Sequence, residues 1–214
     1  MKGGAGQMKR AACLALTALF ARGSTTMAAT EEARYTVEQQ DGPVEVRRYA
    51  PQVVAEVRID GRMEDAGNKA FQPLFRYISG NNRAKAKIAM TSPVGQEKAP
   101  GEKITMTAPV GQQAANGAWA VTFMMPARYN LDTLPEPLDE RVRLREVPGR
   151  RMAAIRYSGR WTRRRYDLHL AKLRKWLEEQ GLVASGEPVW ARYNPPFTPS
   201  FLRRNEILIP LRDE

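Results

Sequence analysis

The 214-residue chain has few of the side chains that usually catalyse reactions. It contains one histidine, His169, and one cysteine, Cys13. Hydrolytic and redox sites are normally recognised from a nucleophile with its base and acid, or from metal ligands at regular spacing, and the sequence shows neither pattern. An acid–base site made of glutamate and tyrosine stays open as an alternative, but no particular pair of residues indicates one. We therefore expect no catalytic activity.

Aromatic and basic side chains gather instead near the end of the chain. A proline-rich loop carries Tyr193, Phe197 and Phe201, and it is followed directly by Arg203 and Arg204. A stiff loop that exposes aromatic rings to water is unfavourable unless the rings pack on something. The partner of this loop is either the rest of the protein or a flat apolar ligand.

Alternation of apolar and polar residues predicts strands through most of the chain. The predicted strands cover residues 35–39, 44–49, 53–59, 119–125, 142–147, 151–157, 188–193 and 207–211. Asp41-Gly42 is a favoured hairpin turn between the first two strands. Pro148-Gly149 is expected to turn strand 142–147 back onto strand 151–157 as its partner.

Two stretches have apolar residues at helical spacing, residues 63–79 and 162–180. In the first, the apolar residues fill half of the circumference. Packing on a sheet explains most of that width, and a ligand cleft near the start of the helix is the sharper alternative. Pro73 is predicted to kink this helix or to interrupt its hydrogen bonds locally. In the second helix His169 lies at the edge of the apolar face.

A ten-residue pattern occurs twice in the middle of the chain, at residues 87–96 and 103–112. Each copy alternates apolar and polar side chains and contains the sequence Met-Thr-x-Pro-Val. Since proline lacks the N–H that a strand ladder needs, each copy predicts a short strand that ends at its proline. Met90 and Met106 are expected to fill the core.

A looser repeat relates the two halves of the chain. Residues 57–63 match residues 155–161, and both stretches lead into a predicted helix. A β-β-α-β unit used twice predicts two halves related by a pseudo-twofold axis, with their sheets meeting in one core. We expect a single α+β domain over residues 30–214.

The start of the chain is typical of a targeting segment. Residues 1–29 combine basic residues with an apolar run over residues 11–21 and small residues near Ala28, which predicts a cleaved secretory signal peptide and a periplasmic location. A retained membrane anchor is the alternative. The formal net charge of +11 favours anionic partners in general, without choosing among them.

Four motifs together resemble the SOUL family of haem-binding proteins, in the bacterial form that has the doubled Met-Thr-x-Pro-Val sequence. They are Tyr49 with Pro51, the helix end at residues 77–82, the segment 87–94, and residues 193–197 with Arg204-Asn205-Glu206. The resemblance covers about residues 35–211. It implies a distorted antiparallel β-barrel of two pseudo-symmetric β-β-α-β halves with two flanking helices, which agrees with the internal repeat.

The resemblance also implies that haem or another tetrapyrrole binds in a shallow apolar cleft between the first helix and the loop before the last strand. The implied contacts are Met63, Ala66, Ala70 and Leu74 facing Tyr193, Phe197 and Phe201, with Arg203, Arg204 or Arg62 as cations for the two propionates. Pairing of Arg204 with Glu206 within the fold is the alternative. Some family members bind the haem iron through a histidine. Because no local motif supports that role for His169, we expect hydrophobic capture without a protein ligand to the iron.

Other functions stay open beside haem carriage or buffering. The chain could be a small-molecule-binding or hydrolytic protein of the related twofold-symmetric fold. The basic run Arg163–Arg165 and the net charge also fit a membrane-surface module with weak affinity for anionic lipid, although a solvated face is the simpler interpretation. No nucleic-acid partner is expected, because export argues against one. We expect a monomer.

Overall fold

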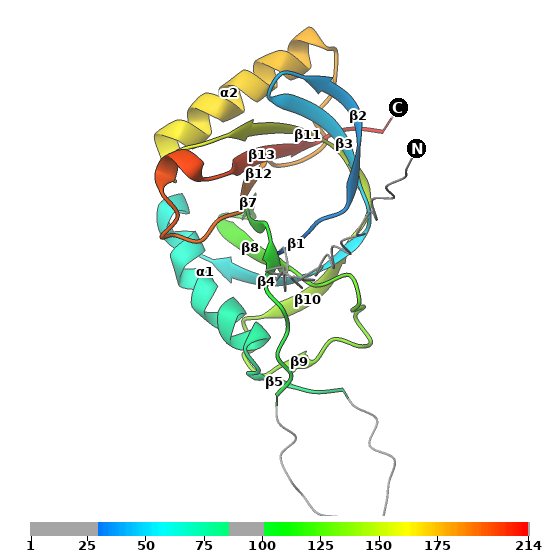
Figure 1. The fold of residues 1–214 in the computed structure, drawn as a ribbon, viewed down its shortest axis with the longest axis vertical. Coiled ribbons are helices and arrows are strands. Elements are labelled where there is room, and N and C mark those ends of the chain that lie inside the picture. Colours follow the sequence, from blue (N-terminus) through cyan, green and yellow to red (C-terminus); the bar gives the residue numbers. More distant parts are fainter. Residues whose placement is uncertain (1–29, 86–100, 214) are drawn as a thin grey trace, which may run out of the picture.

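The computed structural model describes residues 30–85 and 101–213 as one α+β fold built around a curled sheet (Figure 1). The strands of the main sheet are β2 Tyr35–Asp41, β3 Val44–Tyr49, β4 Gln52–Ile59, β7 Val110–Ala115, β8 Ala118–Met124, β10 Arg143–Val147, β11 Arg150–Tyr157, β12 Val189–Arg192 and β13 Asn205–Pro210. The remaining elements are α1 Met63–Ile78, α2 Arg163–Glu179, the 3₁₀ turn Ser200–Leu202, and the short strands β1 Glu31–Glu32, β5 Asn82–Arg83, β6 Thr107–Ala108 and β9 Glu136–Pro137. The main sheet is antiparallel throughout.

The strand order shows two equivalent halves. It is β10-β4-β8-β7-β12-β13-β11-β3-β2, so β4-β8-β7 in the first half corresponds to β11-β13-β12 in the second. Helix α1 follows β4 as α2 follows β11, and the halves meet where β7 pairs with β12. The predicted distorted barrel with two flanking helices is confirmed.

The consecutive strands β3 and β4 pair with the consecutive strands β11 and β10. β10 pairs with β4 and β11 pairs with β3, and the register runs through the corner, with Val147 opposite Gln52 and Arg150 opposite Tyr49. The predicted hairpin between residues 142–147 and 151–157 is therefore wrong. Pro148-Gly149 carries the chain from one half to the other, because both strands find partners in the ribbon formed by β3 and β4.

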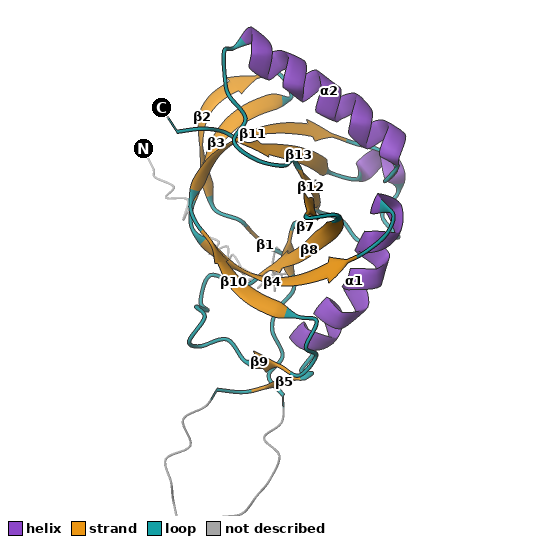
Figure 2. Cartoon of the chain, turned by 180° about the vertical axis from the view of Figure 1, so that it is seen from behind, coloured by secondary structure: helices purple, strands orange, loops and turns teal. Residues whose placement is uncertain are grey.

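Both helices pack on the outer face of the curled sheet (Figure 2). Ala66, Ala70 and Leu74 of α1 meet Ala55 and Val57 of β4 in one apolar cluster. In the other cluster Leu173, Trp176 and Leu177 of α2 meet Ile155 of β11 with Ile207 and Ile209 of β13. Helix α1 is assigned without interruption from Met63 to Ile78, with Pro73 buried inside it. None of the helices in residues 30–85 and 101–213 is long and apolar enough to cross a membrane.

The repeated Met-Thr pattern is only partly visible. The whole first copy, with Met90, falls in residues 86–100, which lie outside the described residues. In the second copy residues 103–106 form no strand, and the chain enters β6 and then β7 on either side of Pro109. The Ile104 amide donates to the carbonyl of Ile78, 2.7 Å away, and its side chain is buried under α1. Packing against the end of the helix thus replaces the strand expected there.

Candidate functional site

A groove lies between α1 and the loop of residues 193–204 and has a volume of about 410 Å³. Its walls are formed by Gly67, Asn68, Phe71 and Gln72 of α1, residues 106–108 and Val110, Trp161 before α2, Arg192 of β12, and residues 193–197 of the loop, with Thr30 at one end. We call this site the α1–loop groove. In Figure 1 the loop, in orange, crosses the place where the N-terminal ends of α1 and α2 approach each other. Its size is that of a small-molecule site.

The structure uses different faces of α1 for the core and for the groove. Met63, Ala66, Ala70 and Leu74, predicted as ligand contacts, are each at most 2% exposed and pack in the two core clusters. They do not line the groove. Phe71 lines the groove. Its ring stacks on that of Phe75, one helical turn further on, and both rings are partly exposed to solvent.

Hydrogen bonds hold the loop that forms the opposite wall. The guanidinium of Arg203 donates to the carbonyls of Thr198 (2.8 Å) and Pro196 (2.5 Å) and lies over the ring of Trp161. The backbone N–H of Arg204 donates to the side-chain oxygen of Asn194 (2.6 Å). These bonds fix the loop while Phe197 at its tip stays 87% exposed. Phe201 is also exposed but does not line the groove.

The two arginines predicted to meet propionates are engaged within the fold. Arg203 supports the loop as described, and Arg204 donates to both Glu206 (3.0 Å) and Glu32 (2.8 Å). The predicted pairing of Arg204 with Glu206 is therefore present. Arg62 is largely exposed, with only Glu64 nearby at 3.8 Å.

Glu206 is the centre of a buried polar network on the inner face of the sheet. It accepts two hydrogen bonds from Arg47 (2.7 and 3.1 Å), and one from the Tyr193 hydroxyl (2.7 Å). Burial alone would raise the pKa of Glu206, but its bonds to Arg47 and the charge of Arg204 outweigh burial and lower it. Burial beside this carboxylate raises the pKa of Tyr193. The network joins Arg47 of β3, Glu206 of β13 and Tyr193 after β12, so it ties these three segments together.

Arg192 is a groove residue that the sequence did not single out. Its guanidinium lies against α1 at Gly67, donates to the side-chain oxygen of Gln112 (3.2 Å), and sits 5.4 and 5.2 Å from the rings of Trp161 and Trp190. Strand alternation could have predicted that the Arg192 side chain points inward, because it lies two residues from the buried Trp190 on the same strand and so shares its sheet face. Gly67, a glycine inside the predicted first helix, could likewise have indicated that another group comes close to the helix there.

His169 lies away from the groove on α2. Its Nδ1 atom is 2.8 Å from the Arg165 carbonyl, which can only accept, so Nδ1 carries the hydrogen. The ring stacks on Tyr157 with centroids 3.9 Å apart. Burial lowers the pKa of His169. Within the described residues no three His, Cys, Asp or Glu side chains form a group that could hold a metal ion.

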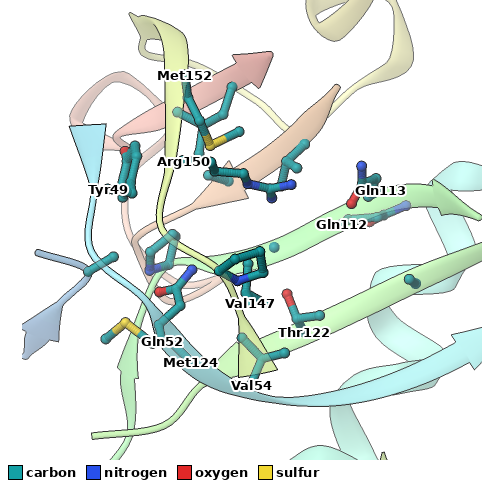
Figure 3. Close-up of a pocket in the computed structure, with 18 of the residues that line it drawn as sticks. Tyr49, Gln52, Val54, Gln112, Gln113, Thr122, Met124, Val147, Arg150 and Met152 are labelled. Atoms are coloured by element: carbon teal, nitrogen blue, oxygen red, sulfur yellow. The ribbon is translucent and has the colours of Figure 1, made fainter. Parts of the chain in front are cut away.

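A second, smaller hollow of about 80 Å³ lies on the inner face of the sheet (Figure 3). Gly111, Ala120 and Ala191 contribute to its lining, and the small size of these residues leaves the space open. Arg150 of β11 reaches into this hollow from the corner of the barrel (Figure 3), and burial lowers its pKa. This volume is far below that of a typical site for a drug-sized ligand, at least about 300 Å³.

The described residues thus form a curled antiparallel sheet with two outer helices and a groove between α1 and the loop of residues 193–204. The chain belongs to the SOUL heme-binding protein family, whose model matches residues 30–210. Heme-binding protein 1 of Xenopus tropicalis is 26% identical over 171 residues, covering 79% of this chain and 84% of the relative. Heme-binding protein 1 of Mus musculus is also 26% identical, over 149 residues, 69% of this chain and 73% of the relative.

Solved structures share the fold at much lower identity. A hydrolase from Listeria innocua matches with a TM-score of 0.55 at 14% identity, over 82% of this chain and 94% of that chain. The C-terminal domain of EcmrR matches with a TM-score of 0.57 at 11% identity, over 84% and 99% respectively. Similarity at this level establishes the fold alone.

Proposed function

We propose that this protein binds haem or a related tetrapyrrole in the α1–loop groove, for carriage or buffering and without catalysis of its own. Membership of the SOUL family supports the ligand class. The observation that carries the site is a groove of about 410 Å³ whose aromatic wall, Phe197, remains 87% exposed on a loop pinned by Arg203. An exposed ring held in place gains apolar contact when a flat ligand enters, and little ordering entropy is lost.

Two other cavities fit a tetrapyrrole less well. The hollow of Figure 3 is about 80 Å³. A crevice of about 450 Å³ near the corner of the barrel is lined by Glu31, Glu32 and Glu146, whose charges repel propionates. Hydrolysis has no specific support here, because the Glu206–Tyr193 pair is locked in an ion-pair network.

The test compares two exposed phenylalanines of one loop. We expect haemin to give a saturable one-to-one shift of the Soret band with the wild-type protein. Phe197→Ser should weaken binding about tenfold or more, since truncating a well-placed aromatic contact costs on the order of 1–3 kcal/mol. Phe201→Ser, a matched control outside the groove lining, should bind as wild type. Equal losses in both variants, or no saturable binding by wild type, would exclude the groove as the site.

Export, a periplasmic location and a monomeric state belong to the same proposal. Residues 1–29 lie outside the described residues, and their sequence is the support for a cleaved signal. Fractionation of expressing cells with N-terminal sequencing of the mature protein tests cleavage and location. Gel filtration with light scattering tests the monomer, with and without haemin.

A further inference from the structure

Arg192 is a partly buried cation in the wall of the α1–loop groove, and one of its N–H groups is unsatisfied. Its Nε atom is buried and has no hydrogen-bond partner. Its one polar partner is the neutral side chain of Gln112, which itself donates to the Met63 carbonyl and is thereby fixed. No carboxylate in the described parts of the chain forms an ion pair with Arg192. The fully buried Arg47, by contrast, pairs with the carboxylate of Glu206.

Because no carboxylate among the described residues pairs with Arg192, the charge of its guanidinium is energetically unfavourable where it lies. Burial lowers the pKa of Arg192 to about 10. A charge removed from water is normally paired, because only an opposite charge and good hydrogen bonds recover the free energy lost on desolvation. The contacts with Trp161 and Trp190, at 5.4 and 5.2 Å, return only part of this cost.

The helix beside the arginine is built to leave room for it. A Cβ atom on Gly67 would lie 2.3 Å from one terminal nitrogen of Arg192 and 2.7 Å from the other. Glycine in the interior of a helix stabilises the helix less than alanine does. Helix α1 therefore accepts a weaker residue at the position where the guanidinium approaches.

We propose that Arg192 is the carboxylate subsite of the α1–loop groove and that the ligand is an amphiphile with an apolar plate and at least one carboxylate. This inference rests on the proposed function and specifies which group of the tetrapyrrole this chain recognises. The ligand's carboxylate supplies the missing counter-charge, while the plate covers Phe71 and Phe197. A second carboxylate of the ligand would remain in solvent.

The experiment titrates the protein with haemin and with haemin dimethyl ester, in which both carboxylates are masked. The wild type should prefer haemin by about tenfold to a hundredfold, the effect of one or two charge-assisted hydrogen bonds. Arg192→Met should lose that preference: its affinity for haemin should fall to about its affinity for the ester, and its affinity for the ester should equal that of the wild type. Arg192→Lys should keep part of it. Arg143→Met, an exposed arginine on β10, is the control of equal charge.

The thermal midpoint of the ligand-free variants separates binding from structure. If Arg192 serves the ligand, Arg192→Met keeps or raises the midpoint, because an apolar side chain replaces an unpaired buried charge. A lower midpoint with an intact haemin preference would make Arg192 a structural residue and overturn the proposal. Equal affinity of the wild type for haemin and ester would also overturn it, without any variant. If neither compound binds the wild type, the proposed function itself fails.

Discussion

Glu206 provides a direct test of what stabilises the inner face of the barrel. Its side chain is 0% exposed and that of Arg47 is 2% exposed, so the pair is fully removed from water. Glu206→Gln keeps the shape of the side chain but removes its charge, which leaves Glu45, 2.7 Å from the Nε atom of Arg47, as the carboxylate that still pairs with this buried arginine, and it also takes a partner from Arg204. Breaking one member of a buried pair costs about 3–5 kcal/mol.

The assay is thermal and urea unfolding followed by circular dichroism. For a domain of this size 1 kcal/mol corresponds to roughly 2–4 °C, so the midpoint should fall by about 6–20 °C. Glu146→Gln, at an exposed position on β10, is the control and should change the free energy of unfolding by less than about 0.5 kcal/mol. If Glu206→Gln and the control differ by less than about 1 kcal/mol, the network does not stabilise the fold as argued.

The same pair predicts a pH dependence with a definite sign. The pKa of Glu206 lies below its usual value of 4.5 in the folded protein. Its stabilising contribution is therefore complete above that value and is lost as the pH falls through the lower folded pKa. The difference in unfolding free energy between wild type and Glu206→Gln should be constant near neutral pH and should shrink only below about pH 4.5. A difference that shrinks between pH 8 and pH 6 would point to another group.

Two further substitutions test the groove and its surroundings. His169→Ala should leave the Soret shift with haemin unchanged, because His169 stacks on Tyr157 away from the groove; loss of the shift would move the site to α2. Gly67→Ala should add about 1 kcal/mol of stability in urea unfolding only when combined with Arg192→Met, because in the wild type its Cβ would collide with the guanidinium; an equal gain in both backgrounds would show that Arg192 gives way freely.

The fold could be predicted from the sequence largely because its signals are local and repeated. Hairpin β2–β3 turns at Gly42-Pro43, one residue beyond the predicted Asp41-Gly42, with Gly42 at a φ of +54°, and both helices lie where the apolar spacing predicted them. The partners of β10 could not be predicted in the same way. A Pro-Gly pair after a strand is typical of a hairpin, and only the long-range pairing of β3 with β11 and of β4 with β10 removes that solution.

The residues of the groove were harder to predict than the groove itself. The apolar half-circle of α1 contains Ala66, Ala70 and Leu74, which face the sheet, and Phe71 and Phe75, which do not. Helical periodicity predicts how wide the apolar face is, but it does not predict which of its residues pack in the core and which line the groove. The small residues and leucine fit close to the sheet, while the larger phenylalanine rings lie at its border, where they are half-open.

Charge added a second difficulty, because arginines adjacent in sequence serve different partners. Arg203 and Arg204 stand in the loop that forms the groove, which suggested ligand contact, yet each finds partners within the fold. Arg192 lies just ahead of that loop and has no carboxylate partner among the described residues, so the arginine that we propose for the ligand is the one that sequence context makes least conspicuous.

This division of roles separates stability from binding in the molecule. The Glu206 network holds the inner face of the sheet, and the two apolar clusters hold the helices to its outer face. Phe71 and Phe197 of the groove, by contrast, are exposed, so removing one of these two rings forfeits little folding free energy. Variants of Phe197 should therefore lose ligand without losing stability. Substitution of Ala66 or Ala70 by larger residues should lose both, because it forces α1 away from the sheet and moves one wall of the groove.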